Sequence, residues 1–144
     1  MVVRKMTRDD VEAVYNLSVA CFSEPWSLES IKQEITNPVA SYFVAEQDGE
    51  IVGYSGLWHV LDEGEVINIA VSHTMRRQGI GKLLLKSLFE EAQTHQLSVI
   101  HLEVRESNQA AQELYAQFGF KTIALRKGYY HKPLENAVIM EYRA

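Results

Sequence analysis

The stretch from Glu65 to Glu90 constrains the fold more than any other part of this 144-residue chain. It begins with an apolar run, residues 66 to 71, whose β-branched side chains predict a strand. It continues as a helix with apolar residues at helical spacing. The predicted face of that helix comprises Ile80, Leu84 and Leu88, with Leu83 and Ser87 beside them. A strand that leads directly into a helix is typical of layered α/β folds.

Between the strand and the helix lies the segment Arg76-Arg77-Gln78-Gly79-Ile80-Gly81-Lys82. Its two glycines let backbone N–H groups converge where a helix begins and its first donors are unpaired. That geometry suits a phosphate or pyrophosphate, and three cationic side chains add to the positive field. The alternative is a tight turn with a solvated basic rim. The spacing is not that of a P-loop, and Leu84 stands where the dinucleotide fingerprint has its third glycine.

Length and composition predict one domain, residues 1–144, because 47% of the residues are hydrophobic and can form a substantial core. The net charge of −5 argues against nucleic-acid binding and fits a cationic partner such as a basic peptide. The single cysteine, Cys21, excludes an internal disulfide and suits a reducing cytosol. No apolar run approaches ~20 residues and no signal peptide is recognisable, so we expect a cytoplasmic protein without membrane contact. We expect a monomer or a weak homodimer.

The remaining sequence predicts a mixed α/β sheet with helices on both faces. Helix starts are indicated by a capping box from Thr7 to Asp10, by Ser27, and by Ser107 or Asn108. Asp48-Gly49 predicts a tight hairpin. The predicted strands cover residues 2–6, 41–47, 50–60, 65–71, 98–104, 120–130 and 137–143, and the helices follow residues 7, 27, 79 and 108.

Arg76-x-x-Gly79-x-Gly81 after an apolar strand resembles the acetyl-CoA signature of the GNAT-type N-acetyltransferases, and the predicted element order is that of their fold. The resemblance spans nearly the whole chain. It is sharpest in Phe22-x-x-Pro25-Trp26-Ser27, in residues 68–81, in residues 102–120 and in Arg126-Lys127-Gly128-Tyr129-Tyr130. These segments resemble the RimI branch, whose members acetylate the N-terminal alanine of a small-subunit ribosomal protein. The sequence departs from that branch after Tyr130, where a proline is frequent and His131 stands instead.

The resemblance implies acetyl-CoA as the acyl donor. Its pantetheine arm is expected along the central strand, like an added strand, and its pyrophosphate at the glycine turn. The implied cofactor-binding residues are Ile69, Ala70, Val71, Arg76, Arg77, Gln78, Gly79, Ile80, Gly81, Lys82 and Asn108. Transfer is expected to be direct, because Cys21 lies far from every motif and has no evident base. The five histidines show no ligand spacing, so no metal is expected.

Glu103 is the candidate general base. Along its strand it shares a face with Val99 and His101, and a carboxylate at a strand's C-terminal end reaches the crevice where α/β ligands bind. The alternative is a solvated glutamate at the end of a strand. The resemblance implies the base, which would take a proton from the attacking amine.

Tyr115 is the candidate general acid for the departing thiolate, again by the resemblance. Helical spacing makes Ala111, Leu114 and Phe118 the core stripe of its helix and places Tyr115 at the edge. The alternative is an edge tyrosine that packs its ring and exposes its hydroxyl to water.

Four aromatic residues are expected to line the acceptor site: Tyr129 and Tyr130, on the strand before His131, form one wall, and the resemblance implies Phe22 and Trp26 as the opposite wall. For Trp26 the sequence alone favours a core plug, and for the tyrosines ordinary strand packing is the alternative. The predicted acceptor is the N-terminus of a protein, most specifically an N-terminal alanine of a ribosomal protein. Acetylation of lysine side chains or small amines, and a non-catalytic acyl-CoA-binding subunit, are the competing interpretations.

Overall fold

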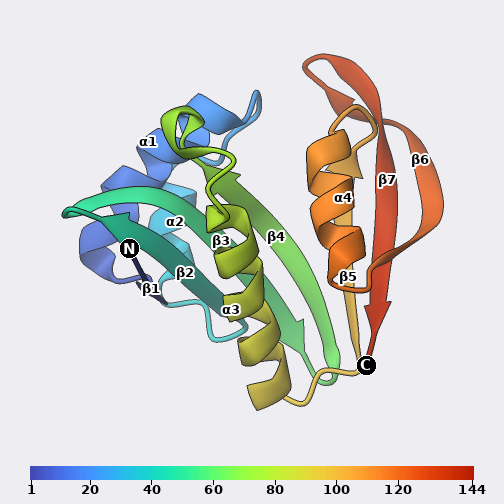
Figure 1. The fold of residues 1–144 in the computed structure, drawn as a ribbon, viewed down its shortest axis with the longest axis horizontal. Helices are drawn as coiled ribbons and strands as arrows, with labels where there is room; N and C mark the ends of the chain where they lie inside the picture. Colours follow the sequence, from blue (N-terminus) through green and yellow to red (C-terminus); the bar gives the residue numbers. More distant parts are fainter.

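Seven strands form one mixed sheet in the computed structural model, which describes residues 1–144 (Figure 1). The strand order is β1-β2-β3-β4-β5-β7-β6, and only β4 and β5 pair in parallel. The strands are β1 Val2–Lys5, β2 Ala40–Gln47, β3 Glu50–Val60, β4 Glu63–Val71, β5 Val99–Arg105, β6 Lys121–His131 and β7 Leu134–Arg143. The predicted mixed α/β fold is thereby confirmed.

Helices cover both faces of this sheet. Helices α1 (Val11–Cys21) and α2 (Leu28–Glu34) pack on one face, and α3 (Ile80–Thr94) and α4 (Gln109–Gln117) on the other (Figure 1). Short 3-10 turns, Arg8–Asp10 and His73–Met75, precede α1 and follow β4. The largest apolar cluster lies between the sheet and the α3/α4 layer. None of the helices combines the length and apolar composition that a membrane-spanning helix needs.

Local signals fixed several element boundaries. Ser27 caps α2, because its Oγ accepts a hydrogen bond from the Ser30 N–H at 3.1 Å. Asp48 and Gly49 turn the β2–β3 hairpin with positive φ angles of 51° and 81°. These predictions, and the capping box between Thr7 and Asp10, are confirmed.

The sheet divides between β4 and β5. The two strands pair only where Glu63–Glu65 meet Val99–His101, and beyond that point they diverge (Figure 1). A β-bulge lies where they separate: Val66 and Asn68 pair with consecutive residues of β3, and Ile67 is the extra residue. Because a bulge bends its strand, β4 turns away from β5 there. The facing edges of β4 and β5 are therefore open along the wedge.

Some predicted details were wrong. In α3 the buried set includes Leu85, whereas Leu83 is 43% exposed, because the face packed on the sheet extends from Leu84 and Leu88 toward Leu85 and Ala92 and not toward Leu83. The expected loop at residues 131–136 is shorter, because the β6–β7 pairing extends to His131 and Leu134.

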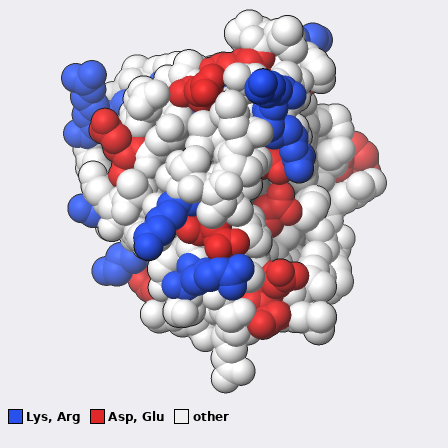
Figure 2. Space-filling view, turned by 90° about the vertical axis from the view of Figure 1, so that its right-hand side faces the viewer, with Lys and Arg blue, Asp and Glu red and all other residues white.

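Charges are interspersed on the surface that carries β6. Figure 2 shows acidic and basic side chains side by side there, without a continuous basic face. That surface lacks the basic patch expected of a nucleic-acid-binding face.

Candidate active site

The glycine turn presents a row of free backbone donors. Gly79 caps α3 in the left-handed conformation, with φ of 78°, and Arg77 also has a positive φ of 64°. The N–H groups of residues 76 to 79 donate to no acceptor in the chain, and the first intrahelical bond runs from Leu83 N to the Gly79 carbonyl at 3.1 Å. Such a cluster of donors at a helix start is suited to a phosphate or pyrophosphate.

Gly81 brings the start of α3 close to its neighbours. A Cβ at this position would lie 3.5 Å from the Leu114 side chain of α4 and 3.9 Å from that of Val71. The glycine turn therefore lies between the end of β4 and α4, at the open end of the wedge. Arg77 and Lys82 form no ion pair within the chain, so their charges are available at this turn.

Arg76 is positioned differently from the other two cations. Its Nε donates to the Val71 carbonyl at 3.3 Å, and its Nη2 lies 3.9 Å from Cys21 Sγ. This side chain therefore holds the end of β4 against α1. Both contacts of Arg76 are to the protein itself, and its expected role in cofactor binding remains a prediction.

Glu103 lies on β5 just beyond the point where β4 and β5 separate. Its side chain is 25% exposed, and Arg126 Nη1 lies 3.8 Å from its Oε1. The neighbouring Glu103 carboxylate is the main reason why the pKa of Tyr129 is raised. Glu103 shares its face of β5 with His101 and Arg105, as the alternation predicted.

Glu65 is a second carboxylate on the same side of the sheet. It pairs in register with His101, and burial, followed by the charge of Glu103, raises its pKa. Glu65 and His101 also line an open hollow of about 230 Å³, together with Glu63 and Trp58. Glu65 was not predicted as a site residue; its only signal in the sequence is a carboxylate directly before the central apolar run, since the bulge beside it is set by the pairing with β3.

Tyr115 lies on α4, on the face of the sheet opposite to Glu103. The predicted stripe of Ala111, Leu114 and Phe118 packs half-buried against the core cluster, but Tyr115 is the fully buried residue of α4, so it lies within the stripe and not at its edge. Its ring meets Phe120 edge-on at 5.7 Å. Burial, with a smaller effect of Tyr130, raises the pKa of the Tyr115 hydroxyl. A phenol in this setting stays protonated, as a proton donor must be before it reacts.

The predicted aromatic residues lie on two separate segments. Phe22 and Trp26 follow α1 and pack against the α1/α2 cluster. Tyr129 and Tyr130 end β6, with their rings perpendicular and 5.0 Å apart. Burial, followed by the charge of Glu103, raises the pKa of Tyr130 to about 12, so this group belongs to the same electrostatic cluster as Glu103.

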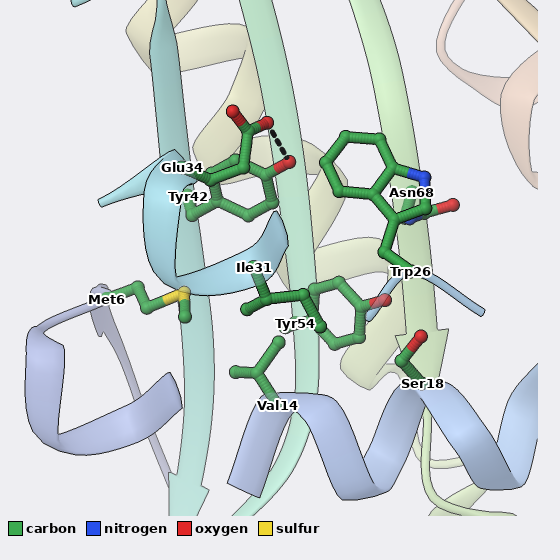
Figure 3. Close-up of a pocket in the computed structure, with 9 residues that line it drawn as sticks. All are labelled: Met6, Val14, Ser18, Trp26, Ile31, Glu34, Tyr42, Tyr54 and Asn68. Carbon is green, nitrogen blue, oxygen red and sulfur yellow. Dashed lines mark hydrogen bonds between the residues drawn. The ribbon is translucent and has the colours of Figure 1, made fainter. Parts of the chain in front are cut away.

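Trp26 also borders a small cavity between α1, α2 and the sheet (Figure 3). The cavity measures about 10 Å³, which is room for one water molecule, so it is a packing gap rather than a substrate pocket. Asn68 of β4 points into it from the sheet, and Glu34 accepts the Tyr42 hydroxyl at 2.7 Å at its edge (Figure 3). Trp26 packs 6.0 Å from Trp58, as the expected plug would.

Asn108 caps α4, because its Oδ1 accepts from the Ala111 N–H at 3.1 Å. Of the two predicted caps it is therefore Asn108, not Ser107, that fills the position. The same side chain was expected to contact the cofactor, and that role remains a prediction.

Comparison with known proteins decides the family. Residues 11–120 match the model of the acetyltransferase (GNAT) family. The chain belongs to the GNAT acetyltransferase family. A Bacillus subtilis (strain 168) protein, provisionally named a [ribosomal protein bS18]-alanine N-acetyltransferase, is 39% identical over 96% of this GNAT chain and 92% of its own length.

Solved structures of GNAT proteins agree with the fold. The crystal structure of the ribosomal-protein-S18-alanine N-acetyltransferase from Escherichia coli has a TM-score of 0.90 and 30% identity, covering 99% of this chain and 92% of that one. A GNAT family acetyltransferase from Elizabethkingia anophelis, solved with acetyl-CoA bound, has a TM-score of 0.80 and 22% identity over 99% of this chain and 97% of that one. The resemblance to GNAT enzymes stated from the motifs is thus confirmed.

Proposed function

We propose that this enzyme transfers the acetyl group of acetyl-CoA directly to the N-terminal α-amine of a protein, and that its substrate is the N-terminal alanine of ribosomal protein bS18. Such a substrate places the reaction in the cytoplasm. The observation that carries the proposal is the placement of Glu103 on β5, just beyond the point where β4 and β5 separate, with Tyr115 of α4 on the opposite face of the sheet. The names of the relatives at 30% identity and above support the choice of acceptor.

In this proposal the chain binds acetyl-CoA at the wedge. The open edge of β4 at Ile69, Ala70 and Val71 takes the pantetheine amides, as an added strand would. The free N–H groups of the glycine turn hold the pyrophosphate, with Arg77 and Lys82 adding positive charge.

The chemistry divides between two side chains. Glu103, on the face of α1 and α2, removes a proton from the acceptor amine, directly or through water, as its nitrogen attacks the thioester carbon. The C–N bond forms and the C–S bond breaks. Tyr115, on the face of α4, donates its proton to the departing sulfur and is later reprotonated from solvent.

A single carboxylate base suits an α-amine better than a lysine side chain. The α-amino pKa is near ~7.7–8.0 and that of lysine near ~10.4, so presenting the neutral amine costs about 3–4 kcal/mol more for lysine. Phe22, Trp26, Tyr129 and Tyr130 would line the groove for the first peptide residues. A small first residue is favoured, because the amine must approach the thioester closely.

The test is an acceptor panel. The enzyme is incubated with acetyl-CoA and peptides that begin with Ala, Ser or Met, and with an N-terminally blocked peptide that contains one Lys. Mass spectrometry locates the acetyl group. We expect fastest turnover at the α-amine of the Ala-first peptide. Equal turnover of the blocked Lys peptide would refute the N-terminal assignment.

A further inference from the structure

Arg105 ends β5, two residues after Glu103 and on the same face of the sheet. The GNAT-like motif around Glu103 includes this residue, but the catalytic scheme gives it no task. Its side chain is 24% exposed and makes more contacts to separate segments than any other charged group near Glu103.

The Arg105 guanidinium holds the turn between β6 and β7. Nη1 donates to the Pro133 carbonyl at 3.0 Å and to Glu135 Oε1 at 3.1 Å, and Nη2 donates to the Lys132 carbonyl at 3.3 Å. The group also lies over the Tyr130 ring, with Cζ 4.4 Å from the ring centroid. These four contacts position Tyr130 and the turn that follows it.

Glu135 extends this contact to the start of α4. Its second oxygen accepts the Ser107 N–H at 2.6 Å. The bond from Ser107, followed by the Arg105 charge, lowers the pKa of Glu135, so the carboxylate stays ionised at neutral pH. The turn is therefore held by Arg105 at the end of β5 and by Ser107 directly before α4.

The same guanidinium crosses the wedge. Arg105 Nη2 donates to Ser23 Oγ at 3.1 Å, and Ser23 lies in the loop after α1 that also carries Phe22 and Trp26. At the closed end, the β4–β5 ladder and the Asp62–Ser98 bonds join the two halves of the sheet. Away from that end, the Arg105–Ser23 bond is the only hydrogen bond between residues 1–97 and residues 98–144.

We propose that Arg105 is a positioning residue that ties together the two aromatic walls of the acceptor groove across the open wedge, and so fixes the acceptor amine relative to Glu103. This inference rests on the proposed function, because the groove is the one assigned to the peptide. The planar fork of arginine is needed, since lysine cannot contact Ser23, Glu135 and two carbonyls at once.

The test compares Arg105→Lys, Ser23→Ala and the matched control Arg143→Gln. Arg143 is an exposed arginine that pairs with Glu141 in the same half of the sheet, outside the site. On an Ala-first peptide we expect kcat/KM to fall about 10–100-fold in Arg105→Lys, because a displacement near 1 Å can cost that much. We expect a fall of roughly 3–10-fold in Ser23→Ala, the scale of one hydrogen bond. Arg143→Gln should resemble wild type.

Three further measurements separate positioning from general damage. Acetyl-CoA affinity by calorimetry should be unchanged in all variants. The Ser23 and Arg105 effects should be non-additive in the double variant, since they remove one shared bond. Hydrogen exchange should become faster at residues 22–27 and 129–136 in both variants and stay slow in the rest of the sheet.

The outcomes distinguish the two proposals. A wild type inactive on every α-amine overturns the proposed function, and the exchange experiment still tests the link between the walls. Unchanged exchange at both walls, or an unchanged kcat/KM for the preferred acceptor, overturns the positioning role. Ser23 is exposed, so Ser23→Ala keeps every core contact. If Arg105→Lys fails to fold, Ser23→Ala still tests the bond across the wedge.

Discussion

Replacing Tyr115 by phenylalanine isolates one oxygen atom in the proposed mechanism. The ring is 7% exposed and packs edge-on against Phe120, so phenylalanine keeps both the burial and the contact. The hydroxyl donates no hydrogen bond within the chain. We therefore expect the free energy of unfolding to change by less than about 1 kcal/mol. By contrast, Tyr115→Ala would cost about 3–5 kcal/mol, because it opens a core cavity.

The rate should respond very differently from the stability. Loss of a general acid lowers turnover by about 10²–10⁴-fold, which corresponds to a barrier higher by about 3–5 kcal/mol. Acetyl-CoA affinity should persist, since the hydroxyl acts on the leaving sulfur. Release of free thiol from acetyl-CoA, followed spectrophotometrically with an Ala-first peptide, measures kcat, and calorimetry measures cofactor affinity.

Tyr142→Phe is the matched control. Tyr142 belongs to the same aromatic cluster, 4.8 Å from Phe89 and 5.9 Å from Phe120, but it pairs with Ile100 near the closed end of the wedge. It should lose its hydroxyl without losing rate. If Tyr115→Phe and Tyr142→Phe had equal turnover, Tyr115 would be a packing residue and the acid assignment would be wrong. Because the pKa of Tyr115 is raised above the usual ~10, wild type should keep this group protonated through pH 9.

Three other perturbations test separate parts of the structure. Gly79→Ala and Gly49→Ala each place a methyl group at nearly the same positive φ, with no neighbour within 4 Å. Both should therefore lower the free energy of unfolding by about 1–2 kcal/mol. Calorimetry should show weaker acetyl-CoA binding only for Gly79→Ala. Asp10→Asn should lower the free energy of unfolding at pH 7 by about 1–3 kcal/mol, since Asp10 accepts two bonds from Arg4 at 2.8 and 3.0 Å. The pKa of Asp10 is lowered in the fold, chiefly by Arg4. The stabilising contribution of the carboxylate is therefore present above the unfolded pKa near ~4 and is lost as the pH falls through the folded pKa. Urea unfolding at pH 3 should show a smaller difference in free energy of unfolding between wild type and Asp10→Asn than at pH 7. Glu103→Gln should lower kcat far more than it weakens peptide binding. In a pH–rate profile the variant should regain part of its rate above the α-amino pKa near ~8, where the neutral amine forms without a base. A profile unaltered from wild type would contradict the assignment of Glu103 as the base.

Local signals in the sequence predicted those parts of the fold that depend on a few neighbouring residues. Ser27, Asn108 and the Asp48-Gly49 turn each satisfy backbone groups within three residues, so their effect does not depend on the rest of the molecule. The positions of Glu103 on its strand and of Gly79 at its helix start followed from the same kind of pattern.

The remaining features depend on contacts between distant segments. Tyr115 was placed at the edge of its helix because spacing alone gives no information on how α4 is rotated against β5 and β7. Arg105 lies within residues 102–120, a segment that resembles the RimI branch, but its partners are 82 residues upstream at Ser23 and 30 downstream at Glu135. The divergence of β4 and β5 was also missed, since an apolar run that predicts a strand does not say where its pairing ends.

The bulge at Ile67 joins these observations into one account of the site. Val66 faces the α3/α4 layer, and in a regular strand Asn68 would face the same way. The extra residue moves Asn68 and Ala70 to the α1/α2 side, where Asn68 lines the cavity of Figure 3 and Ala70 enters the core. The same bulge bends β4 away from β5 directly beyond Glu65, the last residue of their pairing. One inserted residue thus re-aims the side chains of the central strand and opens the wedge between the faces that carry the proposed base, Glu103, and the proposed acid, Tyr115. The proposed mechanism requires that one carboxylate and one phenol both have access to the same thioester, and in that mechanism the access is through this break in an otherwise continuous sheet.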